Sequence, residues 1–344
     1  MGSNRRVAKT LISNVFSIKK DELITITFDK GSNREVITVM LEEAKKVGAK
    51  GMAIEIPEPE APCSGVNDYV PEVVREILKT TDCWFDAGSK VWIYSLPFEN
   101  AFADNEKLRY MVVGGIDTEA LSTLFENIDF STMKKFTSRI IEMIQGAKTM
   151  RFKSEKGSDI TIKINHNHVV AADNGDASLP GFYTPPALVN VVPDFTSANG
   201  KIVSDAIMIN DEWRIVDRPF EINVDDGKIV SMNGSPRDVS ELEKWLEDNG
   251  DENSYRVGHM SMGLSPNILE LKGSIFYDER VFGSMNWGFG HVSPVDAPPV
   301  GQESKTHFDA VTEKASIWID EIQIMESGKF IFSELADYSK ILLD

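Results

Sequence analysis

Residues 23–56 have the sequence LITITFDKGSNREVITVMLEEAKKVGAKGMAIEI, and this stretch decides the fold of the N-terminal region. Residues 23–28 are apolar or β-branched throughout, which predicts a strand. Residues 34–47 repeat apolar side chains with helical spacing, and Gly48 ends the helix. Residues 51–56 form a second predicted strand. A strand, a helix and a strand in this order predict a parallel strand pair covered by a helix.

The same alternation continues on both sides of this stretch. Helices are predicted over residues 7–16 and 70–78, and short strands at 83–85 and 110–113. We therefore predict an α/β domain with a mainly parallel sheet over residues 1–130.

After residue 148 the pattern changes to the alternation of β-strands, with frequent Asn-Gly and Asp-Gly turn signals. Helices are predicted only at 131–146 and 238–248, the second capped by Asp238. Residues 131–344 are therefore expected to form a β-rich α+β domain, and this domain is expected to carry a metal site.

The composition limits the classes of partner. The chain has 344 residues, which is long for a single core, and its 54 acidic and 36 basic residues give a net charge of −18. This charge disfavours nucleic acid. No apolar run approaches the ~20 residues of a membrane helix, and the first residues lack the apolar core of a signal peptide. Cys63 and Cys83 match no metal motif and are expected to be reduced, so we predict a cytoplasmic protein without a membrane partner.

The segment around His307 and Asp309 carries the main chemical signal. In a strand, residues i and i+2 share a face, so this imidazole and this carboxylate would lie side by side. His259, from a distant segment, would complete a set of two histidines and one carboxylate, which binds one face of a metal and leaves the opposite face open. The pattern predicts a mononuclear metalloenzyme. The alternative is a structural His259 and a solvent-exposed pair on the strand.

A glycine-rich aromatic stretch at residues 283–291 ends in His291. It is either a pocket wall with a polar group or a packed turn between strands. Trp287 and Phe289 within it either stack on a planar ligand or belong to the core. The sequence lacks a His-Glu-x-x-His motif, a P-loop and a Gly-x-Ser-x-Gly elbow.

Five segments in order resemble the aminopeptidase T (M29 metallopeptidase) superfamily over most of the chain: 179–193, 200–205, 258–267, 278–290 and 306–309.

Several expected ligands of the two-metal peptidases are replaced in this chain. The first glutamate is replaced by Leu188 or Val189, the second by His259, and a histidine by Asn286. A tyrosine is also missing. A dinuclear site is not expected here, because two adjacent dications need several bridging and terminal anions.

This substitution pattern is similar to the mononuclear-iron 2,5-dihydroxypyridine 5,6-dioxygenase branch of the superfamily. The resemblance implies His259, His307 and Asp309 as ligands of Fe(2+). It also implies that dioxygen opens the ring of a hydroxylated N-heterocycle to give an N-formylmaleamate-type product, and that the protein is a homo-oligomer.

Three further residues are candidates to orient the substrate or to move a proton: Tyr183, Asn286 and His291. Two other functions stay open. One is a mononuclear zinc hydrolase or M29-type aminopeptidase, because two histidines and a carboxylate also serve catalytic zinc. The other is a metal-free, non-catalytic relic of the peptidase fold.

Overall fold

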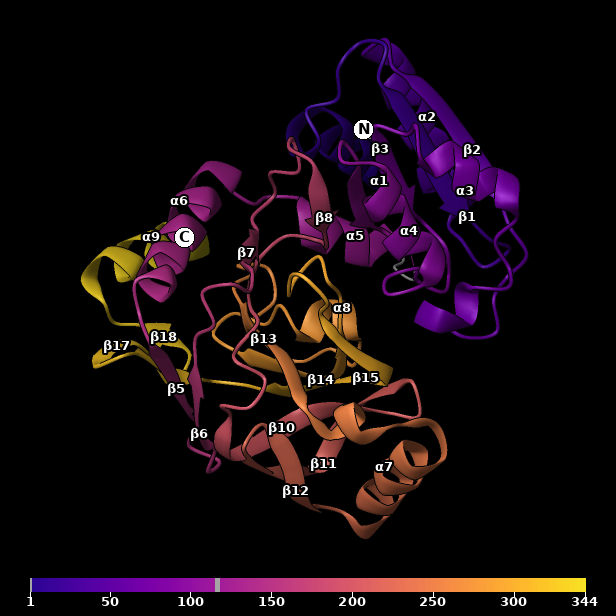
Figure 1. Ribbon diagram of the computed structural model, residues 1–344. Coiled ribbons are helices and arrows are strands. Elements are labelled where there is room, and N and C mark those ends of the chain that lie inside the picture. Colours follow the sequence, from indigo (N-terminus) through magenta and orange to yellow (C-terminus); the bar gives the residue numbers. More distant parts are fainter. Residues whose placement is uncertain (1, 115–117) are drawn as a thin grey trace. The chain divides into compact units, whose positions relative to one another are not determined.

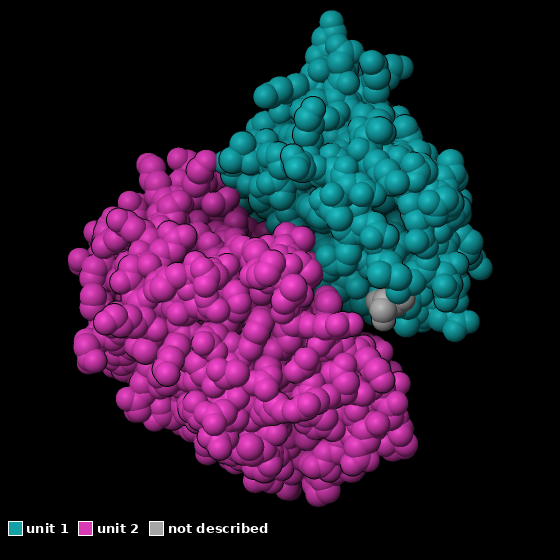
Figure 2. All heavy atoms as spheres, viewed as in Figure 1, with its two compact units in different colours: residues 1–128, 175–186 teal, residues 129–174, 187–344 magenta. Residues whose placement is uncertain are grey.

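The computed structural model describes residues 2–114 and 118–344 (Figure 1). The chain splits into two compact units (Figure 2). Unit 1 comprises Met1–Ile128 and Gly175–Pro186, and unit 2 comprises Asp129–Asn174 and Ala187–Asp344. Within the described ranges, no helix is both long enough and apolar enough to cross a bilayer.

Unit 1 is built on a parallel sheet with the strand order β2-β1-β3-β4-β8. Each neighbouring pair in it is parallel, as the strand–helix alternation predicts. The strands are β1 (Leu23–Phe28), β2 (Lys50–Glu55), β3 (Cys83–Asp86), β4 (Arg109–Val112) and β8 (Gly181–Tyr183).

Two helices of unit 1 begin at a residue whose side chain caps the helix. The side chain of Asn33 accepts a hydrogen bond from the Val36 amide at the start of α2, and the side chain of Ser95 does the same for the Phe98 amide in α4. The helices are α1 (Ser3–Lys9), which continues as a π-helical segment (Thr10–Val15), α2 (Arg34–Lys46), α3 (Glu72–Leu78), α4 (Leu96–Asp104) and α5 (Thr118–Phe125).

Strand β8 joins unit 1 from a distant part of the sequence. Its Gly181 pairs with Arg109 of β4, so residues 175–186 pack with unit 1 although the chain has already entered unit 2. The division of the chain into domains at residues 1–130 and 131–344 stays a prediction. The membership of residues 175–186 in unit 1 was not predicted, because the pairing of β4 with β8 produces no pattern in the sequence of either segment.

Unit 2 contains a large sheet whose neighbouring strands are antiparallel, with the order β18-β17-β16-β5-β6-β10-β15-β14-β13-β9-β7. Strand β11 pairs with β10 and β12 beside this path. The strands are β5 (Thr149–Lys153), β6 (Asp159–Lys163), β7 (Val170–Asp173), β9 (Leu188–Val191), β10 (Asn199–Ile209), β11 (Glu212–Asp225), β12 (Lys228–Asn233), β13 (Val257–Gly263), β14 (Met285–Val292), β15 (Gln302–Thr312), β16 (Ser316–Ile319), β17 (Ile322–Glu326) and β18 (Lys329–Phe330).

Unit 2 also contains the helices α6 (Phe130–Gln145), α7 (Pro236–Asn249), α8 (Ile275–Asp278) and α9 (Ser333–Leu343). The predicted cap of α7 is wrong. Ser235 is the N-cap and accepts from the Asp238 amide, because Pro236 has no amide hydrogen and occupies the first turn. The coarse prediction of a parallel-sheet unit followed by a β-rich unit is confirmed.

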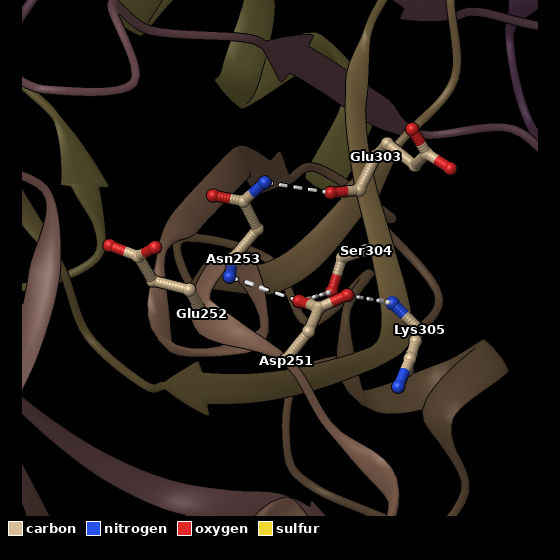
Figure 3. A pocket seen from close by; sticks show the side chains of 6 residues that line it. All are labelled: Asp251, Glu252, Asn253, Glu303, Ser304 and Lys305. Carbon is tan, nitrogen blue, oxygen red and sulfur yellow. Dashed lines mark hydrogen bonds between the residues drawn. The ribbon is translucent and has the colours of Figure 1, made fainter.

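Asp251 fixes the start of β15, the strand that later carries His307. One oxygen of its carboxylate accepts from the amides of Asn253 and Ser254, and the other accepts from the amide of Lys305 at 2.8 Å. A hollow of about 390 Å³ opens here between residues 251–253 and 303–305 (Figure 3). The hydroxyls of Ser254 and Ser304 also donate to this carboxylate, so we assign it a structural role.

Candidate metal centre

Three adjacent strands bring His259, His307 and Asp309 together. In the register, His259 of β13 is opposite Gly288 of β14, and Gly288 is opposite Asp309 of β15. Paired residues of neighbouring strands share a face of the sheet. His307 lies two residues before Asp309, and therefore on the same face.

The middle strand offers no side chain between these groups. It presents Gly288 and Gly290 on the shared face, opposite Asp309 and His307. A Cβ atom at Gly288 would overlap the imidazole ring of His259. Glycine at this position therefore lets the His259 ring cross the middle strand and reach Asp309 two strands away.

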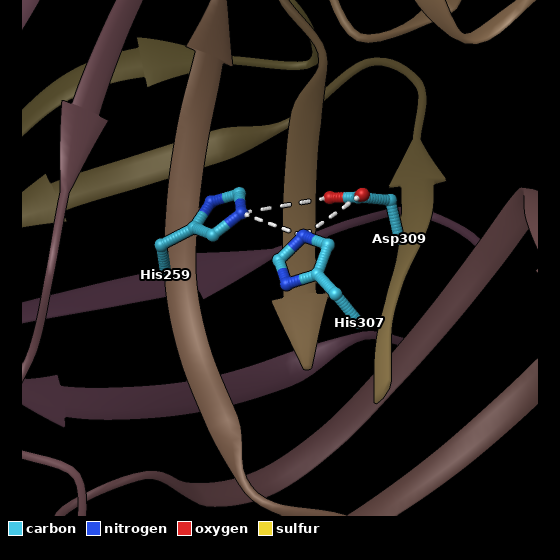
Figure 4. Close-up of side chains that lie close together, drawn as sticks. All are labelled: His259, His307 and Asp309. Carbon is cyan, nitrogen blue, oxygen red and sulfur yellow. Dashed lines mark hydrogen bonds and ion pairs between the residues drawn. The ribbon is translucent and has the colours of Figure 1, made fainter. Parts of the chain in front are cut away.

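The ligand atoms of the three residues converge (Figure 4). The Nε2 atoms of His259 and His307 are 3.3 Å apart, the His307 Nε2 is 3.2 Å from Asp309 Oδ2, and the His259 Nε2 is 3.7 Å from Asp309 Oδ1. The two imidazole rings stack at 13° with centroids 5.2 Å apart. The three side chains are only 17%, 14% and 7% exposed.

These separations fit one metal ion. Two donor atoms each about 2.1 Å from a metal lie about 3.0 Å apart at a right angle and about 3.4 Å apart at the tetrahedral angle. Among the residues that the structure describes, His259, His307 and Asp309 are the group of histidine, cysteine and acidic side chains that could hold a metal. The donor set of two nitrogens and one oxygen suits iron as well as zinc.

Two hydrogen bonds orient the group. The Nδ1 of His307 lies 2.9 Å from the backbone carbonyl of His291 and donates to it, which leaves Nε2 directed at Asp309. The Asn286 amide nitrogen donates to Asp309 Oδ1 at 2.9 Å. Such partners typically fix the ring and carboxylate orientation of metal ligands.

The charge states of two members also suit a cation. Burial lowers the pKa of His259 to about 4, against the opposing charge of Asp309, so this imidazole is neutral near pH 7. Burial alone would raise the pKa of Asp309, but His307, His259 and the hydrogen bond from Asn286 together outweigh it and the pKa is lowered. A neutral imidazole and an ionised carboxylate are the forms that bind metals. For His307, burial lowers the pKa and the charge of Asp309 raises it, with a net rise.

The three further candidates have different surroundings. Asn286 contacts Asp309 directly, and His291 contributes its backbone carbonyl to His307. Tyr183 belongs to unit 1, where its hydroxyl donates to the carbonyl of Leu179 at 2.9 Å.

Trp287 and Phe289 belong to the core. Both are fully buried, and they alternate along β14 with the glycines that face the candidate site. Trp287 packs edge to face on Phe152 with centroids 5.3 Å apart, and Phe289 stacks on Phe308 at 4.8 Å. The stacking role on a ligand is therefore excluded for these two rings.

Sequence reasoning missed Glu279 as part of this region. Its side chain forms an ion pair with the fully buried Arg280 and is 17% exposed. Burial raises the pKa of Glu279, Arg280 lowers it, and the negative charge of Asp309 raises it further. The segment 278–290 was one of the resembling stretches, but nothing in its local pattern indicates which of its acidic residues interacts with the charge of Asp309.

The fold and the site together define a class: a two-unit protein with a parallel sheet in one unit and, in the other, an antiparallel sheet that carries a candidate mononuclear metal centre. The sequence model of the 2,5-dihydroxypyridine 5,6-dioxygenase family matches residues 11–332. The chain belongs to this family of ring-cleaving dioxygenases, and the resemblance seen in its motifs is confirmed.

Two solved structures share the fold along nearly their whole length. The structure of 2,5-dihydroxypyridine dioxygenase from Pseudomonas putida KT2440 has a TM-score of 0.82 at 15% identity, over 98% of this chain and 99% of that chain. Wild-type AmpT from Thermus thermophilus has a TM-score of 0.68 at 14% identity, over 96% of this chain and 99% of that chain. At such identities the likeness shows the fold alone. The search of curated proteins found no match.

Proposed function

We propose that this protein is a non-haem Fe(II) dioxygenase that opens the ring of a hydroxylated N-heterocycle such as 2,5-dihydroxypyridine. The product would be of the N-formylmaleamate type and would contain both atoms of dioxygen. The observation that carries the proposal is the convergence of His259, His307 and Asp309 in a chain matched by the dioxygenase family over residues 11–332.

In this proposal His259, His307 and Asp309 would hold the iron and would leave coordination positions for substrate and dioxygen. Bound Fe(II) would lower the pKa of the substrate hydroxyl and relay electron density from the ring to dioxygen. The carbonyl of His291 keeps the His307 proton on Nδ1 and so leaves Nε2 available as a donor atom. Tyr183, Asn286 and His291 remain proposals for orienting the substrate or moving a proton.

A mononuclear zinc hydrolase or M29-type aminopeptidase is the second candidate. It is favoured by the 3.3 Å separation of the two Nε2 atoms, which lies nearer to the tetrahedral value than to that of a right angle. A non-catalytic relic would show neither activity. A homo-oligomer in the cytoplasm, with no nucleic-acid partner, also remains a proposal.

Anaerobic reconstitution with Fe(II), followed by oxygen uptake on addition of 2,5-dihydroxypyridine, tests the proposal. Uptake of one dioxygen per ring, with loss of the ultraviolet band of the ring, is the expected result. Tight zinc binding with hydrolysis of an amide or ester, and no uptake with any hydroxylated ring, would replace the dioxygenase by the hydrolase.

The ligand assignment has its own test. His307→Ala should abolish bound metal and oxygen uptake together, because the change removes one of three donor atoms. Metal content equal to that of the unaltered protein would contradict the assignment, whatever the activity.

A further inference from the structure

Asn286 is a fully buried polar residue on β14 that is not one of the three proposed metal ligands. It lies two positions before Gly288, and so on the face of the sheet that carries the candidate metal centre. Its cross-strand neighbours in the register are Ser261 of β13 and Val311 of β15. Its amide nitrogen is 2.9 Å from Asp309 Oδ1.

The orientation of this amide follows from the charge of its partner. An ionised carboxylate only accepts hydrogen bonds, so the NH₂ group of Asn286 must face Asp309 and the Asn286 carbonyl must face away. That carbonyl oxygen is buried and has no donor among the described residues. The amide therefore satisfies Asp309 while its own acceptor is left unpaired, which is unfavourable for a residue that serves packing alone.

We propose that Asn286 is a positioning residue that holds the carboxylate of Asp309 in its metal-binding orientation. This inference rests on the proposed metal centre. With Oδ1 engaged by Asn286, the carboxylate is prevented from rotating, and Oδ2 stays 3.2 Å from the Nε2 of His307. A metal ion then meets a donor set that is already arranged, so less conformational freedom is lost on binding.

The test measures metal affinity, which is independent of oxygen chemistry. Asn286→Leu removes the donor at similar size, and dissociation constants for Zn(II), and for Fe(II) under anaerobic conditions, are measured by competition with a chelator. Binding is expected to weaken about 10- to 100-fold, the usual effect of losing such a partner. If the leucine variant does not fold, Asn286→Ser serves instead, because its hydroxyl lies on a one-carbon stem and does not reach Asp309.

Ser261→Ala is the matched control. Ser261 is similarly buried on the neighbouring strand, but its hydroxyl donates to Asn190 at 2.6 Å and to none of the three proposed ligands. Its metal affinity should stay within about two-fold of the unaltered protein. A folded Asn286 variant with unchanged metal affinity would overturn the positioning role. Metal binding by the unaltered protein without ring cleavage would instead count against the proposed function and leave the positioning role intact.

Discussion

At the scale of single residues, the candidate site depends on its proposed ligands and equally on the lack of a side chain at Gly288. His259 and Asp309 come from strands separated by β14, and their side chains meet because the residue between them is Gly288. The Asn286 amide and the His291 carbonyl then fix the carboxylate and the second imidazole. Two of the three proposed ligands, Asp309 and His307, thus have hydrogen-bond partners on the middle strand.

Gly288→Ala should abolish or strongly weaken metal binding. The added Cβ overlaps the His259 imidazole, and because Cβ is fixed to the backbone of a central strand, the ring has to move. We expect at least about a ten-fold loss of metal affinity, as for other disturbed ligand arrangements. The measurement is chelator competition with Zn(II).

Gly146→Ala is the control for that change. Gly146 has φ −86° at the end of α6, and a Cβ there meets its nearest atom, the Glu142 carbonyl oxygen, at 3.5 Å. The control should bind metal normally. Normal binding by Gly288→Ala as well would show that His259 is not a ligand.

Asp86 should make the stability of the protein depend on pH in a range far from that of ordinary carboxylates. Burial raises its pKa to about 7, although the Trp92 amide and the Tyr110 hydroxyl both donate to it. Between the ordinary value of 3.8 and about 7, the folded state binds a proton that the unfolded state has released. The free energy of unfolding should therefore fall as pH rises from about 4 to about 7, at about 1.4 kcal/mol per pH unit at most, and then level off.

Urea unfolding of the unaltered protein and of Asp86→Asn at several pH values between 5 and 8 measures this contribution. The variant starts from a lower stability, since an amide cannot accept all of these bonds. The informative quantity is the difference between the two proteins, which should change with pH below 7 only. A difference independent of pH would mean that Asp86 is ionised in the folded protein.

At the scale of elements, strand β15 is held in place by a hydrogen bond near its start and by a neighbouring strand on each side. Its N-terminal part is held by Asp251, it pairs with β14 along most of its length, and Ala310 and Val311 near its end pair with β10. The i and i+2 spacing of His307 and Asp309 then presents both groups on one face. Local strand geometry supplies the pair, and the pairing of β13 to β15 supplies the third group.

Asp251→Asn should lower the free energy of unfolding by about 1–3 kcal/mol, because the new NH₂ group cannot accept from a backbone amide and because hydrogen bonds to a charged carboxylate are stronger than neutral ones. The affected donors are the amides of Asn253, Ser254 and Lys305. Denaturant unfolding is the measurement. Asp159→Asn is the comparison, since Asp159 is 47% exposed and its pair with Arg151 on the surface should contribute less than about 1 kcal/mol. Equal effects of the two changes would argue against a fastening role for Asp251.

At the scale of the whole molecule, the two units differ in what they contribute. The proposed metal ligands all come from unit 2, and the parallel sheet of unit 1 contains none of them. Strand β8 nevertheless ties a late segment of the chain into unit 1 through its pairing with β4. A ligand that binds only unit 2 should therefore stabilise the units unequally.

Metal should protect β13, β14 and β15 from hydrogen exchange much more than β1 and β3. A metal at 100 times its dissociation constant adds about 2.7 kcal/mol to the stability of the state that binds it. Exchange measured by mass spectrometry with and without Zn(II) tests this, and His259→Ala should remove the difference. Equal protection of both sheets would show that the units unfold together.

Several features could be predicted from the sequence because their signals are local. Strand β1 has its predicted bounds, and helix α2 ends one residue before its predicted end. The i and i+2 spacing of His307 and Asp309 predicts a shared face, and both residues do lie on one strand, β15. The cap of α7 was predicted at Asp238 instead of Ser235, because serine and aspartate both serve as caps and proline at the first position decides between them.

By itself, therefore, the sequence determined the strand and helix periodicities, the order of the two kinds of sheet and the residue types of the candidate site. Only the tertiary structure decided that β13, β14 and β15 are neighbours, that Gly288 lies between His259 and Asp309, and that β8 returns to unit 1. The reason is physical. Periodicity comes from backbone geometry within a few residues, whereas strand order and register depend on pairing between segments far apart in the chain.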